Sequence, residues 1–186
     1  MQAYDSIKST YKRLQICGNS QKLTIELLCK ESHVSRKTFY TFFVNKEDVI
    51  AHIIRDEVMR PLFELQRILP TKEMSQARFL ILSTLFRIIY NDRLFYESLI
   101  IHSKTCPIES ILVREFCEMS THTLSKEGIP DIEREYMAYF YSAALAKLVI
   151  RWVKNHMDLS PEDVATYFGN WVLDGWHKRV GANWIR

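Results

Sequence analysis

Hydrophobic residues recur at helical spacing through most of the chain. Near the N-terminus four of them are three or four residues apart, namely Tyr4, Ile7, Tyr11 and Leu14. This spacing places them on one face of a helix. Gly18 and the polar residues after it are typical of a helix end, so the first helix is expected to stop there.

Two short helices are predicted next, over residues 25–32 and 36–43. Thr24 and Ser35 stand directly before them. Hydroxyl side chains in that position accept hydrogen bonds from the first free amides of a helix, so both residues are expected to be N-caps. Only three residues separate the two helices.

A longer helix is predicted to begin at Lys46. Pro61 is expected to interrupt or kink it near its end, because proline lacks the amide hydrogen that a helix needs. Beyond residue 70 the periodic stretches lengthen, and Pro, Gly, Asn or Ser residues separate them. These stretches predict helices over residues 77–90, 94–104, 108–126, 131–157 and 161–180.

The composition excludes other fold classes. Five Gly and five Pro in 186 residues are too few for the many tight turns of an all-β protein. Hydrophobic residues make up 47% and charged residues 25%, which excludes a disordered chain. We therefore predict an all-α protein of about nine helices.

The distribution of apolar residues also bears on the compartment. The most apolar stretch, residues 136–153, contains Lys147 and Arg151, so we expect no membrane-spanning helix. The first residues carry charges throughout and lack the apolar core of a signal peptide. Four scattered cysteines do not indicate a disulfide framework. The expected location is the cytoplasm.

Basic residues are concentrated at the N-terminal end. Residues 1–46 contain eight Lys and Arg against three Asp and Glu, a net charge of +5, whereas the whole chain carries +3. The remaining 140 residues therefore carry a net charge of −2. This asymmetry indicates that the N-terminal end contacts a polyanion, although a chance excess of surface lysines would give the same numbers.

The two short helices and their three-residue turn form a helix-turn-helix pattern. Leu28, Val34 and Phe39 are spaced to form the apolar contact between the two helices. The second helix is short enough to lie in the major groove of DNA. Its outward side would carry hydrogen-bond donors, two cations and an aromatic hydroxyl, from Ser35, Arg36, Lys37, Thr38 and Tyr40.

The same segment resembles the signature of the tetracycline-repressor (TetR) family of bacterial regulators. The matching residues are Leu23-Thr24-Ile25 and Val34-Ser35-Arg36-Lys37-Thr38-Phe39-Tyr40-Thr41-Phe42-Phe43-Val44-Asn45-Lys46-Glu47-Asp48-Val49. The resemblance covers residues 4–60. It implies a three-helix DNA-binding head over residues 1–50, which continues into a linking fourth helix to about residue 69. Residues 70–186 would then form a helical effector-binding and dimerisation domain.

The resemblance also implies roles for the matching residues. Thr24, Tyr40 and Lys46 would contact DNA phosphates. Arg36, Lys37 and Thr38 would read bases or lie near them. Asn45 would shape the turn before the fourth helix. The complete set of residues expected at the DNA is Thr24, Ser35, Arg36, Lys37, Thr38, Tyr40 and Lys46.

Two positions depart from the family pattern. His33 replaces the glycine usual in the turn, and a left-handed backbone there would strain it. Phe42 replaces a residue that is often His, so one phosphate contact is lost. Phe42 is then expected either to pack in the head or to act as a wedge.

The C-terminal part is expected to form a homodimer. The helix over residues 136–153 is apolar nearly all round, so its second side needs a partner. The last helix repeats this pattern, and the family usually dimerises through its last two helices. The interface residues expected there are Val164, Phe168, Trp171, Val172 and Gly175. A monomeric bundle closed by the same helices is the alternative.

The resemblance further implies an effector pocket between the middle helices. Aromatic side chains with a few polar groups are typical of such pockets, although they are equally typical of a core. The residues expected to line it are Phe86, Tyr90, Tyr96, His102, Phe116, Met119, Tyr139, Phe140 and Ala143. Few ionic groups occur among them, which favours a mostly apolar, aromatic or cationic small molecule.

These expectations combine into one function. The chain would be a homodimeric repressor that binds a palindromic double-stranded DNA operator and is released by a small-molecule effector. The alternatives are an inducer-free DNA-binding protein whose C-terminal domain binds another protein, and an activator. We see no catalytic arrangement, no cofactor motif and no regular zinc-ligand spacing, so an enzyme and a metal site are not expected.

Overall fold

The computed structural model describes residues 2–18, 23–69, 74–102, 107–124 and 130–180, with side chains except at 74–75, 122–124 and 171–180. Within these residues the secondary structure is helical, with no strand, so the predicted all-α class is confirmed. The elements are α1 (Gln2–Ile16), α2 (Ile25–Glu31), α3 (Arg36–Phe42), α4 (Lys46–Ile54), the π-helical turn η2 (Arg55–Met59), α5 (Arg60–Ile68), α6 (Met74–Asn91), α7 (Arg93–Ile100), α8 (Ile108–Leu124), α9 (Asp131–Lys154) and α10 (Pro161–Val180).

The effect of Pro61 differs from the expected break. Residues 46–68 remain helical throughout, so the described chain has the predicted nine helices if α4, η2 and α5 count as one. Pro61 lies in the first turn of α5, directly after η2. A proline removes one hydrogen bond and crowds the carbonyl four residues earlier. The wider π turn accommodates this without ending the helix.

Local capping interactions determine where the helices end. α9 stops at Lys154, three residues before the predicted end. His156 and Met157 have φ angles of 56° and 55°, which no helix continues through. Their amides instead donate to the carbonyls of Val153 and Trp152, at 3.0 and 2.9 Å. This pairing is a Schellman motif, which satisfies the last carbonyls of the helix.

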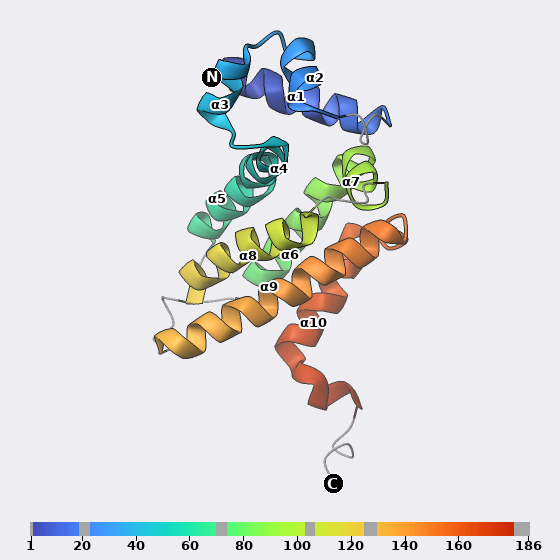
Figure 1. Ribbon diagram of the computed structural model, residues 1–186. Coiled ribbons are helices and arrows are strands. Elements are labelled where there is room, and N and C mark those ends of the chain that lie inside the picture. The colour runs from blue at the N-terminus through green and yellow to red at the C-terminus, as the bar shows by residue number, and fades with distance from the viewer. Residues whose placement is uncertain (1, 19–22, 70–73, 103–106, 125–129, 181–186) are drawn as a thin grey trace.

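The N-terminal head packs as the helix-turn-helix pattern predicts. α1, α2 and α3 gather at one end of the molecule, with α4 leading away from them (Figure 1). Leu28 and Phe39 are fully buried, and Val34 packs against the same core. Phe43 is also buried. The apolar contact predicted between α2 and α3 is therefore confirmed.

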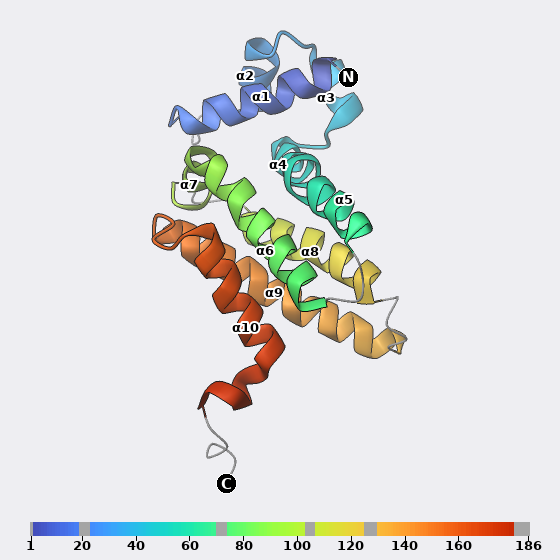
Figure 2. The ribbon, with the colours of Figure 1, turned by 180° about the vertical axis from the view of Figure 1, so that it is seen from behind.

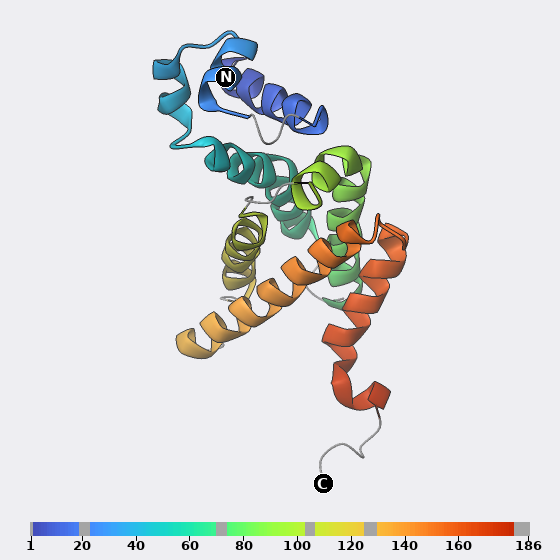
Figure 3. The ribbon, with the colours of Figure 1, turned by 45° about the vertical axis from the view of Figure 1, so that its right-hand side comes forward.

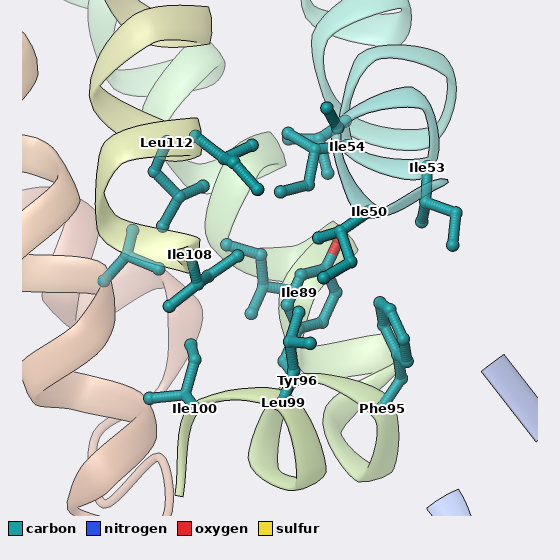
Figure 4. Close-up of a cluster of buried hydrophobic side chains, with 14 of the residues drawn as sticks. Ile50, Ile53, Ile54, Ile89, Phe95, Tyr96, Leu99, Ile100, Ile108 and Leu112 are labelled. Atoms are coloured by element: carbon teal, nitrogen blue, oxygen red, sulfur yellow. The ribbon is translucent and has the colours of Figure 1, made fainter. Parts of the chain in front are cut away.

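The core continues from the head into the rest of the chain without a gap. Figure 4 shows side chains of α4 lying against side chains of α6, α7 and α8. They include Ile50, Ile53 and Ile54 from α4, Ile89 from α6, Phe95, Tyr96 and Leu99 from α7, and Ile108 and Leu112 from α8. Burying one such side chain contributes roughly 1.5–3 kcal/mol. The head is thus joined to the body through packed residues.

Two helix pairs form most of the body. α8 lies along α9, and α10 lies along α6 (Figures 2 and 3). The C-terminal part of α10 extends past the end of α6, and the N-terminal part of α9 projects on another side (Figure 3). The head lies at the opposite end from the free end of α10 (Figure 1).

Candidate nucleic-acid interface and effector groove

The turn between α2 and α3 requires a left-handed residue. His33 has a φ angle of 56°, at the position where the family pattern has glycine. The His33 amide donates to Lys30 O at 3.3 Å, and the Val34 amide donates to Cys29 O at 3.0 Å. These two bonds form a second Schellman motif, so His33 takes the strained conformation anticipated for it.

The outer side of α3 is open to solvent. Arg36, Lys37 and Tyr40 are exposed, with Tyr40 57% exposed, although Phe39 between them is completely buried. Ser35 caps α3 as predicted, because its hydroxyl accepts the Thr38 amide at 3.0 Å. The hydroxyl oxygens of Ser35 and Thr38 also lie 2.8 Å apart. The capped helix α3 therefore presents two cations and a phenol to solvent.

A second group of polar atoms gathers beside α3, at the start of α2. Thr24 caps α2 by accepting the Leu27 amide at 3.1 Å, which confirms its predicted capping role. Lys46, at the start of α4, donates from Nζ to the Leu23 carbonyl at 3.3 Å. The structure thus places Lys46 next to Thr24, 22 residues earlier in the sequence.

Two neighbouring residues have structural roles. Asn45 accepts the Asp48 amide at 2.8 Å and so caps α4, as expected. Phe42 is half-buried, and its ring packs edge-on against Tyr4 with 5.6 Å between ring centres. Phe42 therefore packs in the head, which is one of the two roles expected for it.

Part of the basic excess of the head serves structure, which the sequence did not indicate. Lys8 is only 7% exposed and pairs with Asp56 at 2.6 Å. Lys12 pairs with Glu57 at 2.6 Å and with Asp92 at 2.5 Å, and Arg13 pairs with Glu31 at 3.0 Å. Lys8 and Lys12 are paired and largely buried, so they are not available to a phosphate, whereas Arg13 is paired but exposed. The charge that reaches DNA is therefore smaller than the net +5 suggests.

The residues expected to line one effector pocket are distributed over different environments. Phe86, Tyr96 and Phe116 are buried among core side chains, and Met119 packs against that core. Four others lie outside it, with Tyr90, His102, Tyr139 and Phe140 exposed and Phe140 67% exposed. Ala143 is half-buried.

An open groove of about 1030 Å³ runs between α8 and α9. Of the nine expected pocket residues only Tyr139 contributes to it. Its lining residues are Pro107, Glu109, Ser110, Val113, Arg114, Cys117, Glu118, Thr121 and Tyr139. Sequence periodicity missed most of them because they lie on the polar side of α8.

The expected interface residues of α10 are only partly accessible to a partner. Val164 is buried against its own chain, so it stabilises the protomer rather than an interface. Phe168 is half-buried and packs against the same core. The side chains of Trp171, Val172 and Gly175 lie outside the described residues. Exposed apolar side chains also lie on α9, at Ile132, Tyr136, Tyr139 and Phe140.

In the described part of the chain, no group of His, Cys, Asp or Glu side chains is arranged to bind a metal ion. Among the described helices, none combines the length and the hydrophobicity of a transmembrane segment.

A comparison with known protein families identifies the family of this chain. Residues 79–174 match the TetR C-terminal family described as a transcriptional regulator C-terminal region. The match covers just over half of the chain, in the part where the sequence motifs are weakest. The chain belongs to the TetR family of transcriptional regulators. Its helix-turn-helix head is accordingly a DNA-binding head.

Solved structures with the same fold support this assignment. A TetR-family transcriptional regulator from Syntrophomonas wolfei is 16% identical, with a TM-score of 0.66 over 94% of this chain and 96% of that one. The regulator FadR from Bacillus subtilis, solved with stearoyl-CoA, is 15% identical, with a TM-score of 0.61 over 94% and 100%. The dihydroxyacetone kinase operon activator DhaS is 17% identical, with a TM-score of 0.59 over 92% and 94%. No curated protein matches the sequence significantly.

Proposed function

We propose that this TetR-family protein is a homodimeric repressor that binds a palindromic operator through α3. The observation that carries the proposal is the exposed side of α3, where Arg36, Lys37 and Tyr40 project above the buried Phe39. A capped helix of seven residues fits the major groove, and Arg or Lys side chains can donate two hydrogen bonds to guanine. Arg36, Lys37 and Thr38 are the proposed base-reading residues.

Phosphate contacts would fix the position of α3. Thr24 stands at the N-terminus of α2, where free amides and the helix dipole favour an anion, and the Lys46 ammonium lies beside it. Thr24 and Lys46 would bind the same phosphate. Tyr40 and Ser35 flank α3 and would contact the next phosphates. These contacts carry no sequence information but set the register of the base-reading residues.

The homodimer would use α9 and α10. α9 exposes large apolar side chains along one side, with Tyr136 74% exposed. The free end of α10 projects from the body, as a helix does that packs on a second copy (Figure 3). A homodimer aligns two copies of α3 with two half-sites, about 34–36 Å apart on one side of the duplex.

The effector would bind in the groove between α8 and α9. The groove combines apolar walls with the Tyr139 ring and the charged groups of Arg114 and Glu118. A mostly apolar molecule with one polar end fits this lining. The likeness to FadR, solved with stearoyl-CoA, is compatible with an amphipathic ligand of that kind. The protein is proposed to act in the cytoplasm and to have no catalytic activity.

An activator is the second candidate, because DhaS, which has the same fold, is an operon activator. The two candidates share the DNA contacts and differ only in where the operator lies relative to the promoter. An in vitro transcription assay on the selected operator separates them, because a repressor lowers transcript yield and an activator raises it.

Selection of bound duplexes from random DNA tests the proposal. Wild-type protein is expected to enrich an inverted repeat with half-sites about one helical turn apart. The matched control is the double variant Arg36→Ala with Lys37→Ala, which removes both exposed cations of α3 but leaves the buried Phe39 intact. The control should enrich no common sequence. Equal enrichment by both proteins would contradict the assignment of α3.

A further inference from the structure

The π-helical turn η2 is the chain connection between the head and the body, and it carries three consecutive charged residues. Arg55, Asp56 and Glu57 each pair with a different partner. Consecutive residues of a helix point in different directions, so the three partners lie on different sides of η2. η2 is therefore held by ion pairs to more than one neighbouring helix, which a flexible linker would not be.

Arg55 connects η2 to the body. Its Nε donates to Glu115 Oε2 at 3.1 Å and its Nη2 donates to Glu115 Oε1 at 2.8 Å. The Glu115 side chain is 2% exposed and lies on α8, one of the two helices that form the groove. These hydrogen bonds raise the pKa of Arg55 despite the opposing effect of burial. A two-bond pair of this geometry fixes both distance and orientation.

Asp56 connects η2 back to the head. Its carboxylate accepts Lys8 Nζ at 2.6 Å and Tyr4 Oη at 2.6 Å, and both residues lie on α1. Burial raises the pKa of Asp56, but these hydrogen bonds from Lys8 and Tyr4 outweigh that effect and lower it. The ionised carboxylate is thus the form that the folded head stabilises.

Glu57 completes the junction through Lys12. The Lys12 ammonium lies between Glu57 on η2 and Asp92 directly before α7, so it joins head, connection and body. Burial lowers the pKa of Lys12, but the bonds to Asp92 and Glu57 outweigh this effect and raise it. All three charged residues of η2 are therefore paired with α1 or α8, and Lys12 extends the contact with α1 to the residue before α7.

We infer that this junction, residues 55–57 with their partners, sets the angle of the head on the body, and that Arg55 and Glu115 are positioning residues for DNA binding. A small rotation at η2 moves α3 by a larger distance, because α3 lies at the far end of the head (Figure 1). In a dimer this rotation changes the separation of the two copies of α3. The inference rests on the proposed function, since it requires a dimer on an inverted repeat.

The test compares two variants that each remove one guanidinium from a carboxylate. Arg55→Gln removes the contact between η2 and α8. Arg67→Gln is the control, because it removes a contact of 2.9 Å from Nη1 to Glu64 Oε2 that lies within α5. Arg114 keeps Glu115 paired when Arg55 is replaced, so the Arg55→Gln variant is expected to fold. Thermal melting checks this for both variants.

The measurement is affinity for duplexes that carry the wild-type-selected half-sites at spacings from three base pairs shorter to three longer. Wild type and Arg67→Gln are expected to prefer the same spacing. In Arg55→Gln the ratio of the affinity at the preferred spacing to the affinity at the other spacings should fall by at least about threefold. The half-site sequence that the variant selects should not change. Arg55→Lys keeps the charge without the two-bond geometry and should fall between them.

An unchanged spacing preference in Arg55→Gln would overturn the inference and leave the proposed function intact. If wild-type protein selected no inverted repeat, the proposed function and the inference would both fail. A second measurement needs no operator: spin labels placed at residue 41 of cysteine-free protein report the distance between the two copies of α3. A broader distance distribution in Arg55→Gln than in Arg67→Gln is expected, and identical distributions would also overturn the inference.

Discussion

At the level of single residues, the basic side chains of the head have two different roles. Lys8, Lys12 and Arg13 form close ion pairs with carboxylates of the same chain. Arg36 and Lys37 are exposed, and Arg36 only approaches the exposed carboxylate of Glu26, at 3.8 Å. The sequence shows the total charge but not which residues a distant carboxylate will neutralise, because Asp56 and Glu57 become neighbours of α1 only on folding. Motif position, by contrast, identified the exposed residues of α3 correctly.

The two classes of DNA contact predict different mutational effects. Arg36→Ala should relax preference at one base position per half-site, by roughly 1–3 kcal/mol. Tyr40→Phe and Lys46→Ala should weaken binding to every sequence, and Lys46→Ala should also lower the salt dependence by about one unit of slope per half-site. Fluorescence anisotropy on single-base operator variants, repeated over a salt series, measures both effects. A uniform loss in Arg36→Ala would make Arg36 a backbone contact.

Asp56→Asn should destabilise the folded head. It leaves the buried Lys8 ammonium without its carboxylate, at a cost of about 2–3 kcal/mol at neutral pH. Because the pKa of Asp56 is lowered, its contribution is present above the ordinary carboxyl pKa of about 4 and disappears as the pH falls below it. Urea unfolding should therefore separate wild type from the variant at pH 7 but much less at pH 3.

The matched control for this prediction is Asp131→Asn, which removes an exposed pair with Arg134 on α9. Exposed pairs of this kind contribute roughly 0–1 kcal/mol to the free energy of unfolding, so little change in that free energy is expected. A loss in Asp56→Asn that is no larger than in the control would show that the pair with Lys8 does not stabilise the head.

At the level of helices, capping residues could be read from the sequence and the π turn could not. Thr24, Ser35 and Asn45 cap α2, α3 and α4, because short polar side chains before an apolar run have few other uses. The π turn before Pro61 leaves the hydrophobic spacing almost unchanged, so periodicity gives no signal for it. It becomes visible only through the hydrogen bonds of Arg55–Met59.

The strained turns predict which helix ends can be stabilised. His33 and His156 both occupy the left-handed position of a Schellman motif, with φ angles of 56°. His33→Gly removes the strain of the side chain there and should raise the free energy of unfolding by about 0.5–1 kcal/mol. His33→Val should lower it, because β-branched residues are least compatible with that backbone.

His156→Gly is the comparison for His33→Gly, since it makes the same change at the end of α9. The two variants should raise the melting temperature by similar amounts, and only His33→Gly lies close enough to α3 to alter DNA affinity. A fall in melting temperature on His33→Gly would show that the imidazole stabilises the turn by more than its strain.

At the level of the whole molecule, the sequence predicts apolar surfaces but not what covers them. Periodicity marked Phe86, Phe116 and Phe140 alike as apolar, yet two are core residues and Phe140 is 67% exposed. Which helix covers which side depends on crossing angles that no local pattern contains. For the same reason eight of the nine residues expected in the pocket do not line the groove between α8 and α9.

The last prediction concerns the exposed side of α9. Phe140→Glu places a carboxylate in the surface that we propose a second copy covers, where it would have no partner and should weaken association by about 2 kcal/mol or more. Ile68→Glu is the matched control, since Ile68 is 77% exposed at the end of α5, away from α9. Sedimentation should show dimers for the control and helical monomers for Phe140→Glu. The monomer should also lose affinity for the inverted repeat but not for one half-site. A dimeric Phe140→Glu variant would place the interface elsewhere, on the free end of α10.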